Sequence, residues 1–133
     1  MRLEFRIEGL ERVERRFSQA RIDAAKRAGF DAALLTLEGE AKQAATEIIY
    51  QKPERGYRRT GLYRASLGRG HAQNIRRVQR NEATFGTSVR YARFLEQGTR
   101  YMRPRRVLQT AVTRGGGRIS QAYARAFIRE LRR

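Results

Sequence analysis

The first residues of the chain alternate between apolar and charged side chains. Leu3, Phe5 and Ile7 fall on one side of an extended backbone, and charged residues fall on the other. Alternation with a period of two is typical of a half-buried β-strand. The pattern therefore predicts a strand over residues 2–8, which ends at Gly9.

Two helical patterns follow this strand. Apolar residues at helical spacing predict a short helix over 10–17. A longer stripe, rich in alanine, predicts a helix over 22–50 that packs on a sheet. Its two glycines, Gly29 and Gly39, each weaken it by about 1 kcal/mol relative to alanine. A basic stretch containing Pro53 and Gly56 ends it.

The middle of the chain predicts a turn or short helix over 61–67, with Thr60 as its N-cap. Residues 73–79 and 83–89 have the character of strands, and the tight connection between them predicts a β-hairpin. A short amphipathic helix is expected over 91–97. Gly98 closes this helix.

The last third begins with a basic loop around Pro104, followed by a predicted helix over 107–113. Three glycines at 115–117 then predict a hinge, which we favour over an arginine–glycine RNA-binding segment. A final helix is expected over 118–133. Strand, helices, hairpin and helices in this order predict an α+β fold, a small antiparallel sheet packed by one long helix and shorter helices. We expect one domain over 1–133, with 114–133 as a C-terminal helical extension.

Length and composition narrow the class of protein. A chain of 133 residues forms one domain with a modest core. It contains no cysteine, so we expect neither disulfides nor thiolate chemistry. No apolar run approaches the roughly 20 residues of a membrane helix. The charged N-terminus does not resemble a signal peptide, so we expect a product made and used inside a cell or in an assembly built there.

The charge is large and unevenly distributed. The net charge is +17, from 30 basic and 13 acidic residues. Residues 1–51 carry nine of each sign, whereas 52–133 carry twenty-one basic and four acidic residues. A GC-rich genome could account for arginine in place of lysine, but it does not account for the missing acids. We therefore expect an anionic partner, which is nucleic acid, an acidic protein surface, or both.

Catalytic residues are sparse. His71 is the single histidine and has no cysteine to join it in a common zinc site. Glu38, Glu40 and Glu47 lie on the predicted long helix. Glu40 and Glu47 share a face of it, and solvated charge beside Lys42 is a sufficient interpretation of this pair. We expect no enzyme, no metal and no cofactor. A nuclease or lysozyme is the alternative that would depend on these three glutamates.

Three cationic clusters are candidate contacts to DNA or to an acidic protein, and we weigh the two partners equally. They consist of Arg55, Arg58 and Arg59; Arg76, Arg77 and Arg80; and Arg100, Arg103, Arg105 and Arg106. Arginines in loops contact a phosphate backbone without reading bases. Such binding weakens as salt rises, because each neutralised phosphate releases counterions.

Two segments resemble a known family. Residues 59–67 read Arg-Thr-Gly-Leu-Tyr-Arg-Ala-Ser-Leu, and residues 91–99 read Tyr-Ala-Arg-Phe-Leu-Glu-Gln-Gly-Thr, followed by Arg103-Pro104. Together they resemble the head–tail joining, or tail-completion, proteins of long-tailed phages. The matching positions are Thr60, Gly61, Leu62, Ser66, Tyr91, Ala92, Leu95, Glu96, Gly98, Thr99, Arg103 and Pro104. The chain departs from the family pattern at Arg105 and Arg106, where the family commonly has an aromatic or apolar residue before Pro-Ala.

The resemblance implies a structural virion protein assembled in the host cytoplasm. It implies a closed ring of copies, often six in this family, that completes the phage neck. The ring's partners would be the portal or connector, with its adaptor and stopper proteins, and the tail tube or tail terminator. Genomic DNA would pass through the channel of the ring, and its contacts with the ring would not depend on base sequence. The resemblance implies no membrane partner. A free, non-specific nucleic-acid-binding protein is the alternative that the net charge leaves open.

The motif residues also carry local expectations. Thr60 would cap the turn that Gly61 permits, and Gly98 would take the left-handed conformation. Tyr91, Phe94 and Leu95 would pack the short helix onto the hairpin. Glu96, surrounded in sequence by arginines, is a candidate for a salt bridge within or between subunits.

Overall fold

The computed structural model describes residues 1–6, 16–50 and 61–133. Its elements are β1 (Arg2–Arg6), α2 (Gln19–Ala45) with a π-helical turn (Thr46–Tyr50), α3 (Leu62–Ser66), β2 (Asn74–Val78), β3 (Glu82–Thr87), α4 (Ala92–Gln97) and α5 (Val107–Leu131). The α+β class, the small antiparallel sheet, the hairpin and the long helix are confirmed. The predicted helix over 10–17 lies almost entirely outside the described residues, as do Thr60, Arg55, Arg58 and Arg59.

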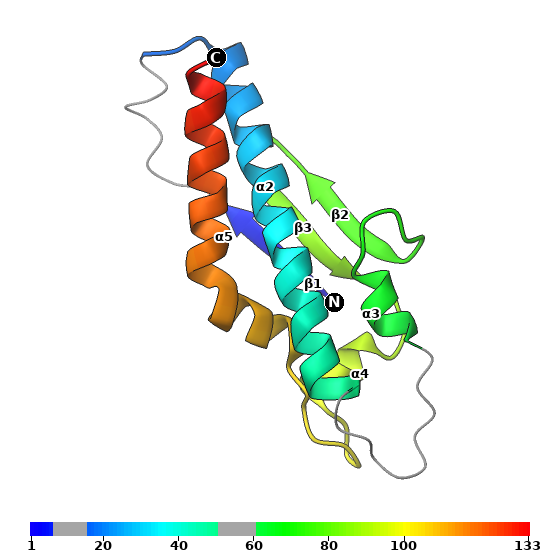
Figure 1. The fold of residues 1–133 in the computed structure, drawn as a ribbon. Helices are drawn as coiled ribbons and strands as arrows, with labels where there is room; N and C mark the ends of the chain where they lie inside the picture. The colour runs from blue at the N-terminus through cyan, green and yellow to red at the C-terminus, as the bar shows by residue number, and fades with distance from the viewer. Residues whose placement is uncertain (7–15, 51–60) are drawn as a thin grey trace.

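The sheet has three antiparallel strands in the order β1-β3-β2. Phe85 in the central strand pairs with Leu3 of β1 and with Arg76 of β2. Since side chains alternate across a strand, Leu3, Phe5 and Phe85 share the face that looks toward the helices. The alternation at the start of the chain therefore corresponds to a strand with one side in the core. Figure 1 shows α2 lying across this face of the sheet.

The two long helices of the described part, α2 and α5, lie side by side and run antiparallel (Figure 1). The Arg21 guanidinium near the start of α2 donates a hydrogen bond to the carbonyl of Arg133 after the end of α5. Between them Phe30 meets Tyr123 edge to face, with ring centroids 5.2 Å apart. Neither helix has an apolar stretch that could span a bilayer, as far as the described residues go.

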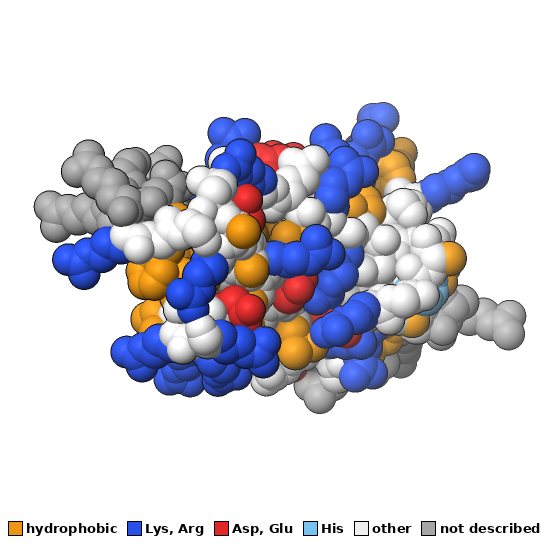
Figure 2. All heavy atoms as spheres, turned by 90° about the horizontal axis from the view of Figure 1, so that it is seen from above, with side chains coloured by type: hydrophobic (Ala, Val, Ile, Leu, Met, Phe, Trp, Pro, Cys, Tyr) orange, Lys and Arg blue, Asp and Glu red, His pale blue; other side chains and the backbone are white. Residues whose placement is uncertain are grey.

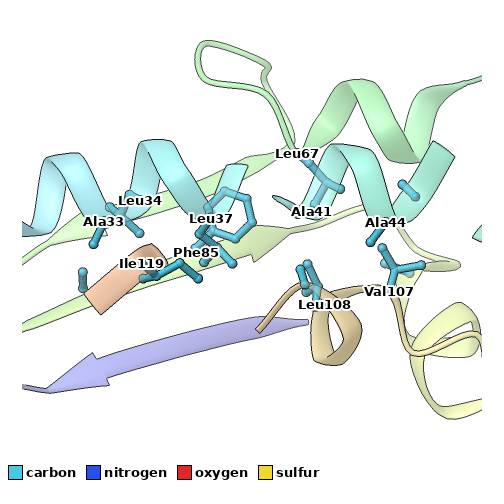
Figure 3. Close-up of a cluster of buried hydrophobic side chains, with 14 of the residues drawn as sticks. Ala33, Leu34, Leu37, Ala41, Ala44, Leu67, Phe85, Val107, Leu108 and Ile119 are labelled. Atoms are coloured by element: carbon cyan, nitrogen blue, oxygen red, sulfur yellow. The ribbon is translucent and has the colours of Figure 1, made fainter. Parts of the chain in front are cut away.

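The core lies where α2, α5 and β3 meet, together with the end of α3. Figure 3 shows side chains from all four segments converging on it. The labelled residues are Ala33, Leu34, Leu37, Ala41, Ala44, Leu67, Phe85, Val107, Leu108 and Ile119, all of them buried. Alanines dominate the α2 side of this cluster, so the helix approaches its neighbours closely.

The predicted hinge at 115–117 is wrong, because α5 runs without a break from Val107 to Leu131. Gly115 faces α2, and a Cβ at this position would lie 2.6 Å from Cγ of Glu40. Packing of the two helices thus outweighs the cost of about 1 kcal/mol per helical glycine. Residues 114–133 are helical as expected, but they form the second half of a helix that begins before them.

Alanine at Gly116 or Gly117 is expected to raise the free energy of unfolding by about 0.5–1 kcal/mol per site. A Cβ at either position meets nothing within 4 Å, so only the helix-forming gain remains. Gly115→Ala is the control, since its Cβ collides with the Glu40 side chain and should give no gain. Urea unfolding measures all three variants. A loss of stability in Gly116→Ala and Gly117→Ala would contradict a continuous α5.

Candidate interaction surfaces

The first motif docks α3 onto the sheet. Gly61 precedes α3 with φ +77°, which confirms that a glycine permits this turn. Ser66 is fully buried, and its hydroxyl donates a hydrogen bond to the carbonyl of Tyr63 at 2.6 Å. The Thr87 hydroxyl at the end of β3 donates to the Ser66 oxygen at 2.7 Å. The serine of the motif therefore joins α3 to the central strand.

The second motif places α4 beside the start of α5. Ala92 and Leu95 form the buried side of α4, and Tyr91 is partly buried against the core. The prediction that Phe94 packs inward is wrong, because 42% of this residue is exposed. The buried positions of this short helix are Ala92, Leu95 and Glu96, and Phe94 lies on its exposed side.

Glu96 caps a helix from another part of the chain. It is only 5% exposed, and its Oε1 accepts a hydrogen bond from the backbone N–H of Leu108 at 2.5 Å. The carbonyl of Leu95 accepts from the N–H groups of Arg105 and Arg106, at 2.6 and 3.2 Å. The first N–H groups of a helix have no partner within the helix. A carboxylate at this position accepts a hydrogen bond from them and also interacts favourably with the positive end of the helix dipole. The described contact of Glu96 is thus a helix cap, and a salt bridge between subunits stays a prediction.

Tyr63 lies close to the same carboxylate. Burial raises the pKa of its hydroxyl far above the ordinary value, and the negative charge of Glu96 raises it further. The hydroxyl is buried without a hydrogen-bond partner of ordinary geometry in the described part of the chain. Tyr63 therefore remains neutral and contributes packing at this junction of α3, α4 and α5.

The loop between α4 and α5 has a defined shape. Gly98 has φ +76° and ψ 174°, so the expected positive φ is confirmed while ψ is extended instead of left-handed helical. The Thr99 N–H donates to the carbonyl of Met102 at 2.9 Å, and its Oγ1 accepts from the N–H of Tyr101 at 3.1 Å. Arg106 immediately precedes α5 with φ 50° and ψ 48°. It is the one non-glycine residue with positive φ in the described ranges.

The three glutamates of α2 are dispersed among basic partners. Glu38 binds Lys42 at 3.0 Å and Arg76 at 3.4 Å. Glu40 binds Arg118 at 2.6 Å, and Glu47 binds Arg114, so these two acids join α2 to α5. The interpretation of Glu40 and Glu47 as solvated charge beside Lys42 is therefore wrong, because Lys42 pairs with Glu38, whose side chain is only 13% exposed.

The pKa values at these sites follow from the ion pairs. Burial acts to raise the pKa of Glu38, but the hydrogen bond and charge of Lys42 and the charge of Arg76 hold it below the ordinary value.

Within the described ranges, no three or more histidine, cysteine or acidic side chains gather as metal ligands would. His71 is half-buried in a turn, where its Nδ1 accepts a hydrogen bond from the N–H of Gln73.

The hairpin arginines do not form one surface. Arg76 points to the helix side of the sheet, where its side chain is 17% exposed and paired with Glu38. Arg77 follows it on the opposite face and is exposed. Arg80 is paired with Asp23 at 3.3 Å. Of this predicted cluster, Arg77 therefore remains as the best-placed contact for an external anion.

The loop arginines do share one place in the fold. We define the basic end as Arg90, Arg93, Arg100, Arg103, Arg105 and Arg106, which lie on or beside α4 and the loop into α5. Figure 1 shows this region at the end of the molecule where α2 finishes and α5 starts. The cationic cluster predicted from the sequence did not include Arg90 and Arg93, although both lie within or next to the second motif.

The opposite end of the molecule is also basic but carries acids. Figure 2 looks onto this end, where α2 begins and α5 finishes, and shows acidic side chains between the basic ones. Arg80 pairs with Asp23 there, and Arg133 pairs with Glu130 at 3.6 Å. Charge is therefore partly compensated at this end.

Comparisons with protein-family models, with curated proteins and with solved structures find no match to this chain.

Proposed function

We propose that the chain is a structural subunit of a ring in the neck of a tailed phage. The ring completes the tail or joins it to the head connector, and DNA passes through it. The observation that carries the proposal is the placement of the two motifs. Ser66 ties α3 to β3, and Glu96 ties α4 to α5, so each motif contributes one buried residue that holds two elements together. The resemblance therefore includes residues whose contacts hold the fold together, and it does not rest on the order of the motifs alone.

The sheet offers a route to self-association. β1 and β2 are its outer strands, and each has one edge that no described strand pairs. Backbone groups at such an edge are available to a strand of another subunit. A head-to-tail contact of this kind closes into a ring when the rotation between subunits is a fraction of a full turn.

Ring formation by the isolated protein is expected to increase with salt. Copies that each carry a net charge of +17 repel one another, and added salt screens this repulsion over distances above about 8 Å at physiological ionic strength. Sedimentation velocity at a fixed protein concentration, in low and high salt, measures the fraction in the larger species. A ring that dissociates as salt rises would show that ion pairs between subunits dominate instead.

The role itself is tested in particles. A phage that lacks this protein should produce full heads beside unattached tails in electron micrographs, and supplying the wild-type chain should restore joined particles. A strictly monomeric protein that never associates with a connector or a tail would contradict the proposal. Joined particles in its absence would contradict it equally.

A further inference from the structure

Most arginines of the basic end form no ion pair with the residues that the structure describes. Residues 90–106 contain six arginines and one acid, Glu96. Glu96 is buried and occupied in capping α5. Within this range, five arginines are exposed and form no ion pair with a described residue: Arg90, Arg93, Arg100, Arg103 and Arg106. Positive charge is thus concentrated at one end without a compensating acid on the described surface.

The backbone that carries these arginines is held in place. The turn from Thr99 to Met102 is closed by hydrogen bonds in both directions, and the Leu95 carbonyl anchors the residues before α5. Arg106 occupies the left-handed region, which costs a residue with a side chain about 1–2 kcal/mol relative to the ordinary conformation. Glycine or asparagine would adopt this conformation more easily, so the fold alone does not favour an arginine here.

Exposed aromatic rings lie among the arginines. Tyr101 is 90% exposed, and the Arg100 guanidinium lies 5.8 Å from its ring centroid. Phe94 is 42% exposed, with the Arg93 guanidinium 5.3 Å from its ring centroid. Arginines interleaved with accessible aromatic rings are typical of surfaces that bind phosphate groups and stack on bases.

We propose that the basic end binds the phosphodiester backbone of nucleic acid without reading its base sequence. A duplex presents one negative charge per roughly 1.7 Å of its axis, which matches several closely spaced arginines. Cores of protein interfaces are depleted of charge, so an acidic protein would have to bury many ion pairs at once. The inference goes beyond the ring role and applies equally to a free subunit.

The experiment is a fluorescence anisotropy titration of the full chain with a labelled duplex and with a labelled single strand of the same sequence. The test variant is Arg93→Gln/Arg100→Gln/Arg103→Gln. The matched control is Arg125→Gln/Arg129→Gln/Arg132→Gln, which removes the same charge from exposed positions in and just after the second half of α5. Circular dichroism and urea unfolding verify that both variants fold, which is expected because every altered side chain is exposed.

Each arginine that contacts a phosphate contributes about one unit to the slope of log affinity against log salt. The test variant should therefore lose about three units of slope, and roughly hundred- to thousandfold in affinity near 0.1 M salt if all three arginines contact phosphates. The control should lose no more than about threefold, because it removes only long-range attraction. Equal losses in the two variants would overturn the proposal, since binding would then depend on net charge alone.

Two further arms identify the occupant. Tyr101→Ala should weaken single-strand binding roughly five- to hundredfold and leave duplex binding unchanged if bases stack on this ring. Unchanged binding to both probes would show that bases do not stack on Tyr101 and that the basic end binds the phosphates alone. A polyglutamate peptide that binds as tightly as DNA, with the same loss in the test variant, would overturn the proposal in favour of an acidic protein partner.

Discussion

Replacing Gly98 with alanine is expected to lower the free energy of unfolding by about 3 kcal/mol. With φ +76° and ψ 174°, the backbone lies in a region that residues with a side chain rarely adopt. A Cβ there would also lie 2.8 Å from the carbonyl oxygen of Met102 and from Cδ and the nitrogen of Pro104. The loop would have to move away from the end of α4 to accommodate it. Urea unfolding measures the loss.

Gly70→Ala is the matched control for Gly98→Ala. Gly70 also has a positive φ, of +87°, but a Cβ at this position meets nothing within 4 Å. The variant Gly70→Ala should lose about 1 kcal/mol of unfolding free energy, which is the cost of a positive φ for a residue with a side chain. Equal losses at the two glycines would show that the close approach of Pro104 does not contribute. A loss of assembly in Gly98→Ala with unchanged stability would place Gly98 in a contact between subunits.

Replacing Glu96 with alanine is expected to lower the free energy of unfolding by about 2–3 kcal/mol. The substitution leaves the buried N–H of Leu108 without a partner and removes a carboxylate from the positive end of α5. It also opens space beside the buried Tyr63 side chain. Thermal or urea unfolding of the purified chain measures the effect.

Glu96→Gln separates the hydrogen bond from the charge. Glutamine keeps an acceptor oxygen for Leu108, so this variant should lose only about 1 kcal/mol. Gln97→Ala, at the exposed neighbour, should change stability by less than about 0.5 kcal/mol. Glu96→Ala could instead be as stable as Gln97→Ala while its subunits fail to assemble. This result would show that the carboxylate acts between subunits, as the predicted salt bridge requires.

Several parts of this protein followed from local sequence pattern. The alternation around Leu3 and Phe5 predicted β1, and the spacing of apolar residues predicted α2, because each pattern reflects which side of a short segment faces the core. The hairpin followed from two strand-like segments joined by a tight connection. The glycines at 61 and 98 marked positions with positive φ. These features depend on neighbours within a few residues, so the local pattern of side chains is sufficient to predict them.

Contacts between distant segments decided the rest. The three glycines of α5 weaken a helix locally, yet packing of Gly115 against Glu40 of α2 keeps that helix continuous. Glu96 became a cap because the fold places Leu108 beside it, and Arg76 was withdrawn from the surface by Glu38. Local preferences amount to about 1 kcal/mol per residue, which burial and pairing across the fold readily exceed. Tertiary structure alone therefore decided where α5 is continuous and which arginines remain available to a partner.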